Sequence, residues 1–473
     1  MTTTVLPDIQ EIMKISQEAF VQYRQVSLSK RAELLEAIAD GIDASGNGLI
    51  ECTMAETNLP EARLLGERAR TTGQLRQFAN ACRKGTLWQN RIDQADANRT
   101  PPKPEIRKTM VPLGPVVVFA ASNFPYAFST AGGDTASALA AGCTVVVKGH
   151  SAHPATSAWV ANIVQEAVAK CQLPAGVFQH VLGPGNVVGE QLVKHPLTAA
   201  VGFTGSFSGG KQLYDWGVSR PVPIPVFAEM SSVNPVFLLP AAIAGKPAEW
   251  AAALAGSVML GVGQFCTNPG IMVGLASPQL DAFIAALAEA ITKANPAKML
   301  HPGIASSYHS GTQKMLAQQG IQLVAKGAEA NAVSATPMIA KVKAQDFLNN
   351  PALADEVFGP WSILVECENT QEVLAIANSM HGQLTTTLIA NDADAAMAAP
   401  LLQILPYKCG RIIVNGVPTG VEVCPAMNHG GPFPATTDSR FTAVGIDAAL
   451  RFLRPVAYQT VPQAWLPEQL QHT

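Results

Sequence analysis

The sequence predicts an α/β fold built on a parallel sheet, and three observations support this prediction. Two short apolar runs rich in β-branched residues, Gly114–Ala121 and Thr144–Lys148, have the length and composition of buried strands. A small-residue helix is expected between them at Ser129–Ala141, and an amphipathic helix follows at Ala155–Lys170, with Trp159 on its apolar face. Strands that alternate with helices at this spacing are typical of a parallel sheet with crossover connections. Continuous apolar strands also indicate that both faces of the sheet are covered.

Further elements extend this pattern along the chain. Residues 7–82 have apolar side chains at helical spacing, and we expect them to be helical. A second α/β region begins near Glu229. We expect two more strands at Val177–Leu182 and Ala199–Thr204, and helices in the second region at Ala248–Gly261, Pro278–Ala294 and Thr370–Asn378.

Two segments do not fit into either α/β region. The polar stretch from Gln89 to Lys108 contains three prolines and predicts an exposed excursion or hairpin, with a simple linker as the alternative. We expect the tail from Ala448 onward to form an arm. Because a projecting hairpin leaves strand edges that must pair, we expect a second subunit to cover them, in a homodimer or a homotetramer.

Composition limits the classes of function. The 473 residues suggest two or three domains at roughly 100–200 residues per domain. The formal net charge is -3 and no long run of like charges occurs, so we expect neither a nucleic acid nor an anionic membrane as partner. The chain shows no secretory signal and no apolar stretch of about 18 residues that would suit a membrane span.

The eight cysteines are scattered and include no C-x-x-C pair. This spacing argues against a zinc finger or a redox dithiol, so we expect no metal site. Free thiols in a reducing compartment, the cytoplasm, are the simplest interpretation.

Three residues have the chemistry of a reaction centre. Cys266 lies between glycines in Gly261-Val-Gly-Gln-Phe-Cys-Thr-Asn-Pro-Gly270, where a thiolate could act as a nucleophile, although an inert buried cysteine is the common alternative. Glu229 follows an apolar run, where burial would raise its pKa toward that of a general base; the alternative is a helix cap or a surface ion pair. Asn123 follows the first strand and could donate to an oxyanion, or be an ordinary turn residue.

Several strand ends could hold a phosphorylated ligand, although each signal is weak alone. Lys148 ends an apolar strand at the edge where α/β sheets bind ligands. The glycine-rich segment that contains Gly185 does not fit the G-x-G-x-x-G pattern. Gly205 and Ser206 form a second strand-to-helix turn that could present backbone N–H groups to a diphosphate.

The order of these motifs is more specific than any one of them. Along the chain come Ser-Asn123-Phe-Pro, Val-Lys148, Phe-Thr-Gly205-Ser206, Glu229-Met-Ser-Ser, Gly-Gln-Phe-Cys266 and Glu356-Val-Phe358-Gly-Pro. This series resembles the aldehyde dehydrogenase superfamily over nearly the whole chain. Segments such as Arg70–Arg76, Glu229–Pro235, His429–Ala435 and Arg451–Gln459 look like the branch of α-ketoglutaric semialdehyde (2,5-dioxopentanoate) dehydrogenases, which is close to NADP-dependent fatty aldehyde dehydrogenases.

The resemblance implies a fold and a set of boundaries. It implies a Rossmann-like parallel-sheet coenzyme domain, a second α/β catalytic domain and a small oligomerisation element. The boundaries would be 1–85 and 110–228 for the coenzyme-binding domain, 229–440 for the catalytic domain, and 86–109 with 441–473 for the oligomerisation element and C-terminal arm.

The resemblance also implies roles for single residues. Cys266 would attack an aldehyde carbonyl, the side chain of Asn123 and the Cys266 backbone N–H would stabilise the oxyanion, and Glu229 would activate the water that hydrolyses the thioester. Lys148 would contact the adenosine ribose, Gly205 and Ser206 the diphosphate, and Glu356 with Phe358 the nicotinamide ribose and ring.

Departures from the family pattern bear on the coenzyme. Most NAD-dependent members have a Glu three residues after the strand-end Lys, where it binds the ribose 2′-OH, but this chain has Ser151. Without that carboxylate a 2′-phosphate is not repelled, and Lys148 can pair with it. We therefore expect NADP in preference to NAD. Ser122 replaces the familiar Trp before the oxyanion Asn.

A keto-acid substrate needs a cation at the mouth of the substrate tunnel. The helix that carries Arg70 would line that tunnel by resemblance, so Arg70 is the candidate for the distal carboxylate, with a surface arginine as the alternative. Phe128, Phe265 and Phe433 would form apolar walls, or belong to the core.

The reaction expected is thus the oxidation of an aldehyde, 2,5-dioxopentanoate first, to the carboxylate. Three alternatives stay open: a broad-specificity or fatty aldehyde dehydrogenase, an enzyme that passes the thioester to coenzyme A, and a silent binding protein. Glu229 argues against the second, because transfer to a thiol needs no activated water. Intact Cys266, Glu229 and Asn123 argue against the third.

Overall fold

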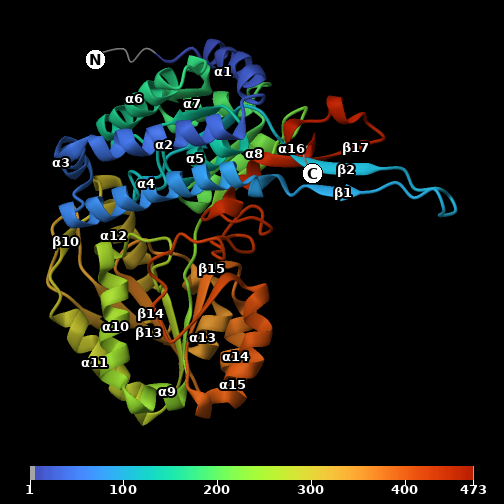
Figure 1. Cartoon of the computed structure of the whole chain (residues 1–473). Coiled ribbons are helices and arrows are strands. Elements are labelled where there is room, and N and C mark those ends of the chain that lie inside the picture. Colours follow the sequence, from blue (N-terminus) through green and yellow to red (C-terminus); the bar gives the residue numbers. More distant parts are fainter. Residues whose placement is uncertain (1–5, 472–473) are drawn as a thin grey trace.

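The computed structural model describes residues 6–471, and its strands form two large sheets and smaller ones (Figure 1). Residues 1–5 and 472–473, at the outer ends of the predicted domains, lie outside the described residues. The domain boundaries expected at residues 85, 109, 228 and 440 stay predictions.

The first large sheet is fully parallel, with strand order β5-β4-β3-β6-β7. Its valine-rich strands alternate between two hydrophobic clusters: Val116 and Val118 pack on one face, Val117 and Phe119 on the other. The strands are β3 (Val116–Phe119), β4 (Val145–Lys148), β5 (Phe178–Val181), β6 (Ala200–Thr204) and β7 (Val226–Glu229).

Helices cover both faces of this sheet, as its continuous apolar strands predicted. One layer consists of α2 (Leu28–Ala44), α4 (Glu61–Lys84), α5 (Gly133–Ala141) and α6 (Pro154–Lys170), with α3 (Gly46–Thr57) beside it. The opposite layer consists of α1 (Ile9–Tyr23), α7 (Gly185–Lys194) and α8 (Phe207–Val218).

The second large sheet has the order β11-β13-β14-β9-β8-β15-β16 and is parallel except at the β11–β13 pair. Its strands are β8 (Val236–Leu238), β9 (Ile271–Leu275), β11 (Gln322–Lys326), β13 (Met338–Lys343), β14 (Trp361–Cys367), β15 (Gln383–Ile389) and β16 (Cys409–Val414). One face carries α9 (Pro240–Gly245), α10 (Pro247–Met259) and α11 (Pro278–Thr292); the other carries α12 (Pro302–Leu316), α13 (Ala344–Asn349), α14 (Thr370–Ser379) and α15 (Ala395–Ile404).

A projecting antiparallel sheet completes the fold (Figure 1). Its strands β1 (Arg91–Asp93), β2 (Ile106–Pro112) and β17 (Leu453–Gln459) have the order β1-β2-β17, so the hairpin interpretation of residues 89–108 is confirmed and the linker alternative is wrong. The short strands β10 (Ala297–Lys298) and β12 (Ser334–Ala335) and the terminal helix α16 (Glu468–Gln471) are minor elements.

The expected strands and helices are present, with three differences. The helix expected from Ser129 begins at Gly133, because residues 129–132 form turns. Trp159 is 40 % exposed, since its ring lies over the backbone of Gly48 in α3 and not in the core. Residues 448–452, expected in the arm, pack into the core through Ala448 and Phe452, so the arm begins at β17.

Within residues 6–471, no helix is both long enough and apolar enough to cross a membrane.

Candidate active site

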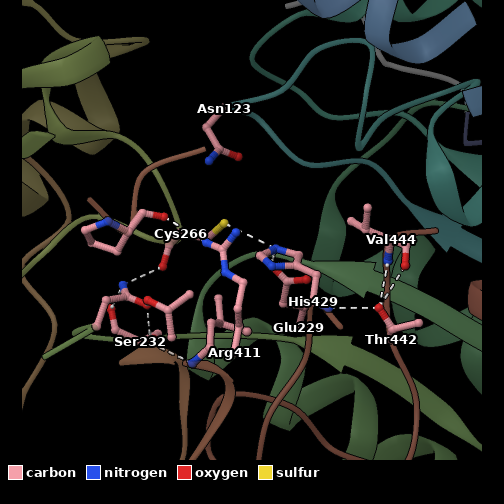
Figure 2. Close-up of polar contacts among 12 residues, drawn as sticks. Asn123, Glu229, Ser232, Cys266, Arg411, His429, Thr442 and Val444 are labelled. Carbon is pink, nitrogen blue, oxygen red and sulfur yellow. Dashed lines mark hydrogen bonds and ion pairs between the residues drawn. The ribbon is translucent and has the colours of Figure 1, made fainter. Parts of the chain in front are cut away.

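The candidate reaction centre lies where the two large sheets face each other. Glu229 ends β7, and Asn123 lies in the loop that follows β3, so both come from the carboxyl edge of the five-stranded sheet. Cys266 precedes β9 and therefore comes from the amino end of the seven-stranded sheet. Figure 2 shows these side chains together with His429, which lies between β16 and the C-terminal segment. The structure thus brings together the three residues expected to carry the chemistry, and adds a fourth.

A sharp turn places Cys266. Gly261, Val262 and Gly263 all have left-handed backbone angles, with φ of 55°, 60° and 65°. A Cβ at Gly263 would lie 2.2 Å from the backbone carbon of Gly359, so only glycine fits there. Val262 in this conformation is strained, because a β-branched residue rarely adopts positive φ. The glycines noted in the sequence therefore serve the approach of this loop to a neighbouring strand connection.

Side-chain amides fix the loop after the turn. Asn234 donates from Nδ2 to the carbonyl oxygens of Cys266 and Asn268, at 2.9 Å each. Its own position is held by Gln383, whose Oε1 accepts hydrogen bonds from the Val233 and Asn234 backbone N–H groups at 2.8 and 3.1 Å. The Glu-Met-Ser-Ser-Val-Asn-Pro segment thus holds the loop that carries Cys266.

Cys266, His429 and Glu229 lie in contact. His429 Nε2 is 3.6 Å from Cys266 Sγ and 2.9 Å from Glu229 Oε1. The Glu229 and His429 side chains are 3 % and 1 % exposed. The Glu229 oxygen lies beside the ring nitrogen but outside hydrogen-bonding direction, because neither carboxylate oxygen has a hydrogen-bond partner among the described residues. The ring nitrogen is therefore placed to serve sulfur and carboxylate in turn.

The surroundings disfavour a resting thiolate. Burial raises the pKa of the Cys266 thiol well above its ordinary value, and the Glu229 carboxylate raises that pKa further because like charges repel. Arg70 acts in the opposite direction. A thiol reacts as its thiolate, so a base would have to take the Cys266 proton before this sulfur could attack, and His429 Nε2 is the nitrogen within reach.

The backbone around His429 is pinned on both sides. Its N–H donates to Thr442 Oγ1 (2.9 Å), and its carbonyl accepts from the Ala443 N–H (2.8 Å). A Cβ at either following glycine would collide: 2.7 Å from the Phe441 carbonyl oxygen for Gly430, and 2.1 Å from the Gln383 carbonyl oxygen for Gly431. Further on, the chain pairs with β7 through an antiparallel bridge between Glu229 and Thr436. The His-Gly-Gly segment is therefore the means by which the imidazole reaches the carboxylate.

Asn123 lies on the other side of the sulfur (Figure 2). The side-chain Nδ2 of Asn123 donates to the Gln264 backbone carbonyl at 3.2 Å. The backbone carbonyl of Asn123 accepts a hydrogen bond from Arg63 Nη2 at 2.8 Å. The first bond is long for an amide donor, so a developing oxyanion would compete well for this N–H.

A cavity of about 390 Å³ opens beside the sulfur. Phe124, Phe128 and Phe265 form an aromatic wall, and Arg63 and Arg70 lie against it. Arg63 stacks 4.7 Å from Phe124 and 4.6 Å from Phe265, while Arg70 stacks 5.2 Å from Phe128. Arg70 also borders a second cavity of about 410 Å³, so its side chain contacts both cavities.

Of the expected wall residues, Phe433 does not line this cavity. Its side chain is 55 % exposed and lies 5.9 Å from the Phe207 ring at the start of α8. The bridge between Glu229 and Thr436 holds this segment beside β7 of the five-stranded sheet. Phe433 thus belongs to the face where a coenzyme is expected.

Residues expected to hold a coenzyme lie along the carboxyl edge of the five-stranded sheet. Lys148 ends β4, where burial lowers its pKa, and Ser151 is exposed in the turn before α6. Gly205 joins β6 to Ser206, which caps α8 by accepting a backbone N–H at 3.2 Å. Gly185 is the first residue of α7. Two helix N-termini and a lysine on one sheet edge suit an anionic dinucleotide.

Glu356 and Phe358 precede β14 and line a small pocket together with Phe265. Burial raises the pKa of Glu356 to about 7, although hydrogen bonds from Ser231 and Ser232 oppose the shift. Glu356 also adds to the negative potential at Cys266.

The sequence alone does not predict a role for three residues that the structure places at the site. His429 was noted only as part of a motif, and the glycine pair after it was the signal that its backbone makes a close approach. Arg63 lies two turns before Arg70 on α4, on the same side of the helix, and no sequence pattern distinguishes it from a surface arginine. Asn234 was within a quoted motif, but no pattern distinguishes a supporting amide from a turn residue.

Comparison with known proteins agrees with this geometry. The model of the aldehyde dehydrogenase family matches residues 3–439. This chain belongs to the aldehyde dehydrogenase family. It is 50 % identical over 468 residues to "Alpha-ketoglutaric semialdehyde dehydrogenase 2" of Azospirillum brasilense, covering 98 % of this chain and 89 % of the relative. It is 45 % identical, with the same coverage, to "Alpha-ketoglutaric semialdehyde dehydrogenase" of Acinetobacter baylyi.

Solved structures share the aldehyde dehydrogenase fold. A lactaldehyde dehydrogenase matches with a TM-score of 0.82 at 20 % identity, covering 96 % of this chain and 91 % of that chain. A glyceraldehyde-3-phosphate dehydrogenase from Methanocaldococcus jannaschii, complexed with NADP, matches with a TM-score of 0.80 at 20 % identity and covers 96 % and 94 %. The predicted fold class and the resemblance are confirmed. The protein is an oxidoreductase that acts on aldehydes, and the family uses NAD(P).

Proposed function

We propose that this enzyme oxidises 2,5-dioxopentanoate, α-ketoglutaric semialdehyde, to the dicarboxylate with NADP. One observation carries the choice of substrate: Arg63 and Arg70 each have a buried Nη1 without a hydrogen-bond partner among residues 6–471, and both side chains line the cavity beside Cys266. Buried guanidinium donors are costly to leave unpaired, and a carboxylate satisfies them well. The names of the two relatives above agree with this choice.

The catalytic roles follow from the contacts. His429 takes the proton of Cys266 as the sulfur attacks the aldehyde carbon, and Glu229 stabilises the imidazolium. The Asn123 amide and the Cys266 backbone N–H stabilise the oxyanion of the thiohemiacetal. Bound NADP would supply the hydride acceptor. The remaining thioester is attacked by a water that Glu229 holds and deprotonates, which releases the carboxylate and the free thiol.

The residues along the five-stranded sheet fit the coenzyme. Lys148 and Ser151 would lie at the adenosine ribose, and Gly185, Gly205 and Ser206 at the phosphates. Glu356 and Phe358 would meet the nicotinamide ribose and ring. The preference for NADP rests on Ser151, since no carboxylate stands there to repel a 2′-phosphate.

Assembly and location belong to the same proposal. Strand β17 pairs only with β2 among the described strands, so its other edge is open to a second subunit, in a homodimer or homotetramer. All eight cysteines are free, which suits the cytoplasm.

A substrate panel tests the proposal. Arg70→Gln and Arg63→Gln should each lower kcat/KM for 2,5-dioxopentanoate about 10- to 100-fold, the value of a charge-assisted hydrogen bond, with little effect on hexanal. Arg76→Gln is the matched control, because Arg76 lies on α4 but pairs with Asp40 and Asp43 outside the cavity. Equal losses for both aldehydes would refute the anionic substrate and favour a broad or fatty aldehyde. Equal kcat/KM with NAD and NADP would refute the coenzyme preference, and a coenzyme A thioester as product would refute the hydrolytic route.

A further inference from the structure

The contact among Cys266, His429 and Glu229 has a second chemical meaning. One ligand atom from each residue, Sγ, a ring nitrogen and a carboxylate oxygen, lies within 4.8 Å of the other two. Thiolate, imidazole and carboxylate are the donors that bind Zn²⁺ in proteins, and three protein ligands with one open position is a common arrangement.

The distances are close to those a tetrahedral ion requires. With Zn–S of about 2.3 Å and Zn–N of about 2.0 Å, sulfur and nitrogen stand about 3.5 Å apart around a tetrahedral metal. His429 Nε2 and Cys266 Sγ are 3.6 Å apart. The nitrogen and a carboxylate oxygen would stand about 3.4 Å apart, whereas His429 Nε2 and Glu229 Oε1 are 2.9 Å apart. A shift of about half an ångström in the carboxylate would accommodate the ion.

The carboxylate of the proposed ligand set is buried and unsatisfied. Both oxygens of Glu229 lack hydrogen-bond partners within the described part of the chain, although its side chain is 3 % exposed. Such a group is costly to bury, and a cation would satisfy it directly. A thiolate and a carboxylate together would neutralise one divalent ion, and the cavity that Cys266 and His429 line leaves its fourth position open.

We propose that Cys266, His429 and Glu229 form a Zn²⁺ site that switches the enzyme off reversibly. The ion occupies the place where the aldehyde carbon must approach the sulfur, and it takes the lone pair of His429 and the oxygen of Glu229. The thiol gives up its proton to solvent as the Zn–S bond forms, and no redox change occurs. Zinc binding and aldehyde binding therefore exclude each other. The expectation from the scattered cysteines, that no metal site exists, stays a prediction, and this proposal departs from it because folding brings together residues that are far apart in the sequence.

Cobalt gives a readout that does not depend on activity. Chelator-treated wild-type enzyme titrated with Co²⁺ should show near-ultraviolet thiolate-to-cobalt absorption and visible bands of a tetrahedral ion, with one Co²⁺ per chain that Zn²⁺ displaces. Cys266→Ala should abolish the thiolate band, and His429→Gln should weaken binding at least about tenfold. Cys52→Ser and His381→Gln, half-buried and exposed positions outside the site, are the matched controls and should bind like wild type. Retention of the thiolate band by Cys266→Ala, or absence of stoichiometric binding to the wild type, would overturn the proposal.

A measurement on the unmutated enzyme avoids the question of folding. Zn²⁺ should slow the alkylation of Cys266 by iodoacetamide at least about tenfold, and a chelator should restore the rate. Cys52 and Cys424, also partly exposed, serve as internal controls in the same peptide digest and should be unaffected. Unchanged alkylation of Cys266 under saturating Zn²⁺ would contradict the site even if Zn²⁺ inhibits turnover. Loss of aldehyde oxidation in every assay, by contrast, would count against the proposed function and not against zinc binding.

Discussion

The two sheets contribute to the active site in different ways. The five-stranded sheet presents the carboxyl ends of its strands, so Glu229 ends β7, Lys148 ends β4 and Asn123 follows β3 closely. The seven-stranded sheet presents the amino ends of its strands, and Cys266 and His429 come from loops outside the ladder. Strand-end residues are positioned by backbone hydrogen bonds, whereas the loop residues depend on glycines and on the amides of Asn234 and Gln383. Substitutions at the strand ends and in the loops should therefore have different effects on activity and stability.

The largest effect after loss of the nucleophile is expected at His429, on the loop side. His429→Gln removes the base that faces a thiol of raised pKa, so kcat/KM should fall about 10²- to 10⁴-fold. Stopped-flow measurement of NADPH formation checks this. His381→Gln, at an exposed position, is the control. A decrease in kcat/KM of less than threefold would show that another group takes the Cys266 proton.

On the strand side, Asn123→Ala should lower kcat about 10²- to 10³-fold, the usual value of one oxyanion donor. The melting temperature should change little, because the loop is held by its backbone contacts, such as the one from Arg63. Steady-state kinetics and thermal unfolding together test this. A large drop in stability would show that the amide is structural.

Burial of Glu356 makes the stability of the fold depend on pH. Its folded-state pKa of about 7 lies above the ordinary 4.5, so the folded state binds more protons than the unfolded state between these values. Stability should therefore fall as pH rises through this window, by up to about 3 kcal/mol from this group. Glu356→Gln should flatten the fall and melt higher than wild type at pH 8, with little difference at pH 4.5. Parallel melting curves for the two proteins across pH 4.5–8 would contradict this.

The smallest effect is expected at Asn234, which holds the loop that carries Cys266. Asn234→Ala leaves buried carbonyls of Cys266 and Asn268 without donors, which should cost about 1–3 kcal/mol in urea unfolding and also lower kcat. Asn331→Ala, at an exposed turn, is the control and should do neither. If Asn234→Ala lost stability without losing activity, the amide would not position the nucleophile.

These contrasts explain how far the sequence could be read. The strands around Val116 and Val145 are predictable because β-branched runs of that length have few alternatives. Cys266, Glu229 and Asn123 are identifiable because the order of motifs resembles a family, whereas each residue alone has an ordinary interpretation. The pairing of His429 with Glu229 is not readable, because it depends on the antiparallel bridge to Thr436 and on two close glycine contacts. The exposure of Trp159 is not readable for a similar reason: apolar periodicity does not show which neighbours leave room.

The proposed reaction requires that the sulfur of Cys266 carries the acyl group and that Glu229 is needed to release it. The most direct measurement is a single-turnover reaction of Glu229→Gln with NADP and 2,5-dioxopentanoate, followed by peptide mass spectrometry. The account predicts a burst of about one NADPH per active site, no further turnover, and an acyl adduct on Cys266. Continued turnover without an adduct, or an adduct on another cysteine, would contradict it.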